Sequence, residues 1–109
     1  MHEEAILRDL RRKLEEIAVR EGGVRIVRVV VRVGALAHLP AAGLRARWPE
    51  TVAGTAADGA RLEVESSSAI DDPRADGIVL VRVDVADGPG GAPPRPAPAG
   101  EVLREPDHP

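Results

Sequence analysis

The sequence contains no cysteine, phenylalanine or tyrosine, and one tryptophan, in 109 residues. Without cysteine the chain forms no disulfide and offers no thiolate to a metal, so its side-chain nitrogen ligands for a metal are His2, His38 and His108. Proteins that bind nucleic acid use aromatic stacking and excess positive charge, whereas this chain has a formal charge of -3. The composition therefore argues against thiol chemistry, a cysteine zinc site and nucleic-acid binding.

Long hydrophobic runs are also absent, since no stretch approaches the roughly 20 apolar residues of a transmembrane helix. The charged start MHEEAILRDL is unlike a secretory signal, so we expect a cytoplasmic protein without membrane contact. The sequence shows no paired base and nucleophile and no glycine-rich phosphate loop. We therefore do not expect an enzyme.

The clearest candidate site is the N-terminal run Met1, His2 and Glu3. A histidine beside a free α-amine places an imidazole, an amine and a backbone amide within reach of one metal ion. Nitrogen ligands in adjacent chelate rings suit a square-planar or tetragonal Ni(II) or Cu(II). The alternative is that Met-His occurs here by chance, in a terminus without a fixed structure.

The spacing of apolar residues predicts an α+β fold with the order helix, strand, helix, strand, strand. A stripe of Ile, Leu and Ala predicts a helix at about residues 4–21, ended by a pair of glycines. Alternation of apolar and polar residues predicts strands at 24–33, 60–66 and 78–85, the last two as an antiparallel pair. Pro40 can begin a second helix, which Pro49 should kink or end. Two helices on one face of a three-stranded sheet would bury the valine rows. The proposed core rows of the first and last strands are Val27, Val29, Val31 and Val33, and Val79, Val81, Val83 and Val85.

The last part of the chain differs from the rest in composition. Residues 1–86 carry the predicted elements, whereas residues 87–109 include GPGGAPPRPAPAG, a composition that does not build a packed core. We expect one domain over residues 1–86 and a disordered tail over residues 87–109.

The order of these elements, together with MHE at the start, resembles the HypA/HybF family of nickel-insertion accessory proteins for hydrogenase and sometimes urease. The segments RIVRVVVRVGAL, GLRARWPETVAGT and ARLEVES are similar to the family's first strand and turn, second helix and second strand. The likeness spans about residues 1–66, and the strand at 78–85 would replace the family's last strand.

The resemblance implies a metallochaperone that binds Ni(II) transiently through the Met1 amine and the His2 imidazole and amide, with Glu3 as a further candidate ligand. It also implies a maturation GTPase and a hydrogenase large subunit as partners. A homodimer is another candidate assembly, because a small sheet open on one side often pairs. Whether Glu3 would give a carboxylate, a backbone nitrogen or only a helix-start charge is left open.

The chain departs from the family where members carry a zinc lobe with two CxxC pairs. The stretch SSSAIDDPRADG stands in that place and has neither cysteine nor histidine, so no zinc is expected. This departure leaves a second hypothesis beside the nickel metallochaperone. The chain would then be a non-metal adaptor or dimerisation domain in which the MHE run is inherited but unused.

Overall fold

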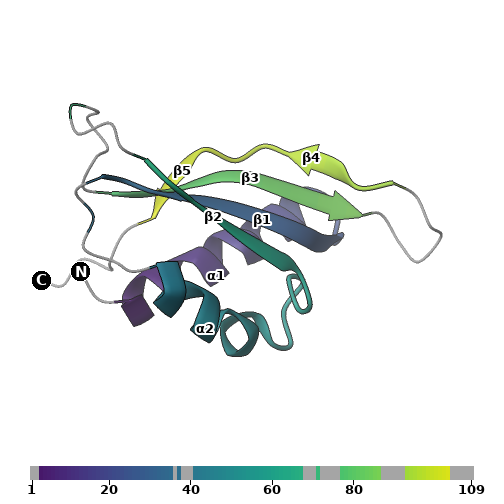
Figure 1. Cartoon of the computed structure of the whole chain (residues 1–109). Coiled ribbons are helices and arrows are strands. Elements are labelled where there is room, and N and C mark those ends of the chain that lie inside the picture. Colours follow the sequence, from purple (N-terminus) through teal and green to yellow (C-terminus); the bar gives the residue numbers. More distant parts are fainter. Residues whose placement is uncertain are drawn as a thin grey trace, which may run out of the picture.

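Two helices cover one face of a mixed β-sheet (Figure 1). The computed structural model describes residues 3–35, 37, 41–67, 71, 77–86 and 93–103. The elements in chain order are α1 (Glu3–Arg20), β1 (Arg25–Val33), α2 (Ala41–Val52), β2 (Arg61–Ser66), β3 (Ile78–Ala86), β4 (Arg95–Ala97) and β5 (Glu101–Leu103). The α+β class and the two helices are confirmed, whereas the sheet formed by the described residues has five strands and not three.

Helix α1 lies along the sheet with its apolar stripe buried, as its spacing predicts. The side chains of Ile6, Leu10, Leu14 and Ile17 are all at most 2% exposed. The helix ends at Arg20, and Gly22 and Gly23 follow with positive φ angles of 97° and 80° that suit glycine. The Gly23 amide donates to the carbonyl oxygen of Ala18 over 2.7 Å and so closes the last turn.

Helix α2 continues past Pro49 to Val52, so Pro49 does not end it. Trp48 and Val52 are 6% and 1% exposed, and their burial holds the last turn against the core. The Thr51 hydroxyl also donates to the carbonyl oxygen of Arg47 over 2.8 Å. Tertiary packing thus outweighs the unfavourable proline. Pro40, the predicted start of this helix, lies outside the described residues.

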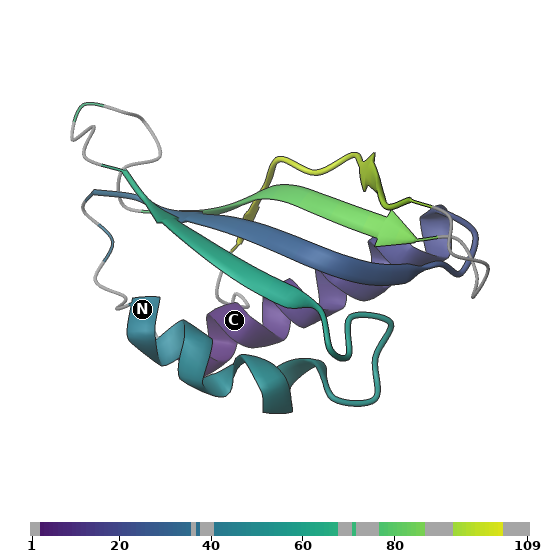
Figure 2. The same cartoon turned by 45° about the vertical axis from the view of Figure 1, so that its right-hand side comes forward.

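Strand β1 occupies the middle of the sheet, with β2 parallel on one side and β3 antiparallel on the other (Figure 2). The predicted antiparallel pairing of β2 with β3 is therefore wrong. Strand β1 has nine residues and is rich in valine, so it removes most apolar surface from water when it lies between two other strands. Strand β2 carries more charged residues and therefore suits the edge of the sheet. At the end of β1, the Ser67 amide donates to the carbonyl oxygen of Val33 over 3.0 Å, and the Gly34 amide donates to that of Gly77 over 2.8 Å.

Strand β1 departs from simple alternation at Val27. In its ladder with β3, Ile26 pairs with Val85 and Arg28 pairs with Asp84, so Val27 is an extra residue. An extra residue of this kind reverses which side chains face the core. The assignment of Val27 to the core is accordingly wrong, because Ile26 is fully buried and Val27 is partly exposed.

Strand β3 has a similar irregularity at Val81. Val30 pairs with Arg82 and Val31 pairs with Leu80, so Val81 is left between them. The predicted core row is therefore correct only in the second half of the strand. The four residues of β3 in the core, all 0% exposed, are Ile78, Leu80, Val83 and Val85.

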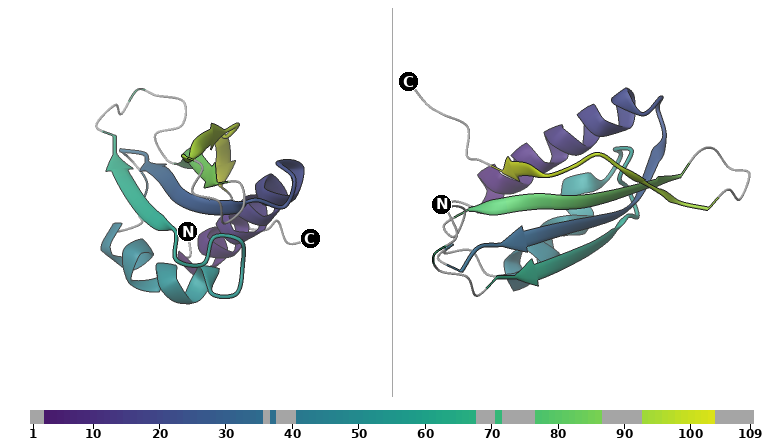
Figure 3. Two further views of the ribbon diagram at one scale, coloured as in Figure 1. Left: turned by 90° about the vertical axis from the view of Figure 1, so that its right-hand side faces the viewer. Right: turned by 90° about the horizontal axis from the view of Figure 1, so that it is seen from above.

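The two additional strands come from the segment that composition predicts to be a disordered tail. Both β4 and β5 pair antiparallel with β3 and extend along it in turn (Figure 3). Ala97 and Leu103 are 7% and 2% exposed and belong to the core. Prolines are tolerated here because these strands form an edge of the sheet. Residues 93–103 therefore pack with the domain, whereas the composition predicts that they belong to a disordered tail.

No helix in the described part of the chain is long and apolar enough to cross a membrane.

Candidate metal centre

Of the three predicted metal ligands, one lies within the described residues. Glu3 is the first residue of the helix, while Met1 and His2 lie outside the described residues. The structure therefore places the last residue of this run at the start of α1. Of the other histidines, His38 and His108 also lie outside the described residues.

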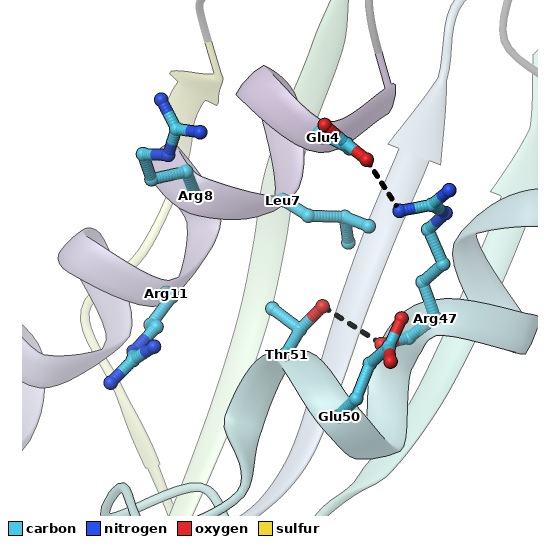
Figure 4. A pocket seen from close by; sticks show the side chains of 7 residues that line it. All are labelled: Glu4, Leu7, Arg8, Arg11, Arg47, Glu50 and Thr51. Atoms are coloured by element: carbon cyan, nitrogen blue, oxygen red, sulfur yellow. Dashed lines mark hydrogen bonds and ion pairs between the residues drawn. The ribbon is translucent and has the colours of Figure 1, made fainter.

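The first turn of α1 is anchored on two sides. Ile6 and Leu7 are 1% and 3% exposed and pack into the core. On the outer side, Arg47 of α2 donates to the carboxylate of Glu4 over 2.8 Å (Figure 4). The helix start is thus joined both to the core and to α2. A firmly held helix start is what a ligand run needs if its atoms are to meet at one point.

A hollow of about 250 Å³ lies between α1 and α2, beside this ion pair (Figure 4). Its lining residues are Glu4, Leu7, Arg8, Arg11, Arg47, Glu50 and Thr51. Three guanidinium groups and two carboxylates give the hollow a positive balance, which disfavours a cation. Within the part of the chain that the structure describes, no group of histidines and carboxylates is placed to hold a metal ion.

Three carboxylates on the open face of the sheet, those of Glu63, Glu65 and Asp84, are engaged with arginines. Arg28 of β1 donates to Glu63 of β2, and also to Asp84 of β3 over 3.4 Å. Arg82 donates to Asp84 over 2.9 Å, and Arg32 donates to Glu65 over 3.2 Å. These bonds join the three strands, and the described residues of this face offer no cluster of ligands for a metal ion.

The charge of Arg28 also changes the acidity of its partner. The hydrogen bond from Arg28 holds the pKa of the Glu63 carboxyl below its usual value, and Glu63 in turn raises the pKa of Arg28. This network was not identified from the sequence. Its signal was the arginines at 28 and 32 in RIVRVVVRV and the glutamates at 63 and 65 in RLEVES, which become neighbours when the two strands pair in parallel.

Comparison with known sequences places the chain in a family. A family model described as "Hydrogenase/urease nickel incorporation, metallochaperone, hypA" matches residues 1–71. A relative from Nitrosospira multiformis, named "Hydrogenase maturation factor HypA", is 34% identical over 65 residues, which are 60% of this chain and 56% of the relative. The chain thus spans little more than half the length of that relative. Because the family match covers most of the sequence and runs from residue 1 through β2, the chain belongs to the HypA family of hydrogenase/urease nickel-incorporation metallochaperones.

Proposed function

We propose that the chain binds Ni(II) transiently at its N-terminus and delivers it to a nickel enzyme during maturation, with [NiFe]-hydrogenase as the target. The observation that carries this proposal is the family match over residues 1–71, which includes the whole Met1, His2 and Glu3 run. The name of the Nitrosospira relative supports hydrogenase as the target. The chain is then an accessory protein and not an enzyme, with nickel as its cargo.

The ligands in this proposal are the Met1 amine together with the imidazole and backbone amide of His2. These three nitrogens form adjacent chelate rings and suit a tetragonal Ni(II). Glu3, at the helix start, is the candidate for a further ligand, through its carboxylate or its backbone nitrogen. Helix α1 supports the site because its first turn is held by the core and by Arg47.

The partners follow from the same family. A maturation GTPase and the hydrogenase large subunit would take part in transfer, both in the cytoplasm. The segment between β2 and β3 contains no cysteine, so the thiolate zinc site of other members has no ligands here and nickel binding would proceed without it.

Titration calorimetry of Ni(II) against the untagged protein tests the site. The matched variants are His2→Ala and a form with residues added ahead of Met1, because the first removes the imidazole and the second converts the amine to an amide. We expect the native chain to bind about one equivalent and both variants to lose this binding. Circular dichroism serves as the folding control.

The competing hypothesis is a non-metal adaptor or dimerisation domain with the same fold. It requires the native chain and both variants to give the same titration curve, since MHE would then have no ligand role. That result would remove the N-terminal nickel site from this chain. Loss of binding in only one variant would instead identify which nitrogen the site depends on.

A further inference from the structure

Strand β2 forms one edge of the sheet. The order of strands is β2-β1-β3-β4, and no described strand or helix continues the sheet beyond β2 (Figure 3). A free edge presents backbone N–H and C=O groups that pair readily with another strand.

The hydrogen bonds to β1 show which backbone groups are free. The Ser67 amide donates to the carbonyl oxygen of Val33, so Ser67 directs its amide toward β1. Along a strand successive residues point their backbone groups to opposite sides. Glu63 and Glu65 therefore face β1 like Ser67, and Leu62 and Val64 present their N–H and C=O groups outward.

We propose that this edge pairs with the same edge of a second copy, in an antiparallel dimer whose twofold axis passes through Glu63. An antiparallel partner of β2 must place outward-facing residues opposite one another. With the axis at Glu63, Leu62 of each copy lies opposite Val64 of the other. Arg61 of each copy then lies opposite Glu65 of the other, and two Glu63 residues meet on the axis. Both strands overlap from Arg61 to Glu65.

The side chains fit this register better than its neighbours. Leu62 and Val64 are partly buried apolar residues packed against the core, so their pairing would continue the apolar layer from one copy to the next. Arg61 is exposed, and among the described residues it has no ion-pair partner within its own copy. Facing Glu65, it would gain a cross-strand pair twice by symmetry.

The repulsion between the two Glu63 carboxylates on the twofold axis is reduced by an arginine within each copy. Each Glu63 already accepts a hydrogen bond from its own Arg28, so the two carboxylates meet as parts of neutralised pairs. Moving the axis to Val64 would place Glu63 opposite Glu65 twice, which is repulsive. Moving it to Leu62 would shorten the overlap within β2 to residues 61–63.

The absence of cysteine gives a direct test, because any introduced thiol can react only with another copy. Single variants with cysteine at positions 61, 62, 63, 64 and 65 would be oxidised at equal concentration, and covalent dimer would be followed over time on non-reducing gels. Facing residues in a pair without mutual hydrogen bonds lie about 4.5 Å apart at Cα, within disulfide range. We expect Glu63→Cys to crosslink at least about tenfold faster than Arg61→Cys and Glu65→Cys.

Charge reversal gives an independent test by sedimentation. Arg61→Glu and Glu65→Arg should each weaken dimerisation, while the double variant should restore it, because the cross-strand pair is rebuilt with its charges exchanged. Circular dichroism would confirm that each variant is folded. Crosslinking that peaks at position 62 or 64, equal slow crosslinking at all five positions, a monomer at every concentration, or no rescue by the double variant would each overturn the proposal. These outcomes do not depend on nickel binding.

Discussion

Trp48 donates its indole N–H to the backbone carbonyl oxygen of Ala60 over 2.8 Å, and both residues are buried. The bond joins α2 to the residue that precedes β2. It satisfies two polar groups that would otherwise lie unpaired in the core. Trp48 is thus both a large apolar residue of the core and a fixed link between the helix layer and the edge strand.

Replacing this tryptophan should separate its two roles. Trp48→Phe keeps an aromatic ring but leaves the Ala60 carbonyl without its donor, so we expect a loss of about 1–3 kcal/mol in the free energy of unfolding. Trp48→Ala should cost about 3–5 kcal/mol because it also creates a cavity. Urea unfolding followed by circular dichroism measures both. Val19→Ala is the control, since Val19 is 76% exposed and its truncation should change little.

The irregularity at Val81 gives a matched pair of identical substitutions in one strand. Simple alternation places Val81 and Val83 on the same face, whereas Val83 is fully buried and Val81 is partly exposed. We expect Val83→Ala to lower the free energy of unfolding by about 2–3 kcal/mol and Val81→Ala by about half of that or less. Equal losses in denaturant unfolding would contradict the observed register.

Substitutions after residue 92 test whether this segment packs against the core, although its composition is typical of a disordered tail. Leu103 of β5 is 2% exposed, so Leu103→Ala should destabilise the protein by about 2–5 kcal/mol. The neighbouring Val102 is more exposed, and Val102→Ala should cost clearly less. If both substitutions left the urea midpoint unchanged, residues 101–103 would not contribute to the core in solution.

The sequence predicts those parts of the fold in which the spacing of apolar residues is compatible with only one buried face. The stripe from Ile6 to Ile17 permits a single buried helix face, and Leu62 and Val64 alternate with charged residues in β2. In β1 and β3, valine occupies both faces, so pattern alone does not reveal the extra residues at Val27 and Val81. These require the ladder between two strands distant in sequence.

The remaining differences have similar causes. The charged composition of β2 suits an edge of the sheet. The order of the strands also depends on whether β1 or β3 lies next to β2, and the alternation of apolar and polar residues does not show this. In β4 and β5 the buried residues Ala97 and Leu103 stand among prolines and glycines that typify a tail. For the candidate site, residue types near a terminus indicate the chemistry. The structure adds the anchoring of α1 by Arg47, a contact between residues far apart in sequence.

The Arg28 and Glu63 pair predicts how acid affects stability. The pKa of Glu63 is lower in the folded protein than its usual value, because Arg28 stabilises the carboxylate. Its contribution is therefore fully present above the unfolded pKa of about 4.3 and is lost as pH falls through the lower folded pKa. Glu63→Gln should reduce the loss of thermal stability in that acid range. The effect should be small, since the Glu63 side chain is 35% exposed.

Nickel binding, in contrast, should weaken at a much higher pH. The proposed site requires the Met1 amine, the His2 imidazole and the His2 backbone amide nitrogen without their protons, and the first two ordinarily have pKa values of about 8 and 6.5. Protons and Ni(II) then compete for the same nitrogens, so the apparent affinity should fall continuously as pH decreases from about 8 to 6. Calorimetry across this range measures the decline, and the number of protons released per ion follows from buffers with different ionisation enthalpies. The fold should remain intact throughout, because the acid effect on Glu63 begins at lower pH. An affinity that does not change over this range would mean that nickel binds elsewhere, through groups already deprotonated, such as carboxylates.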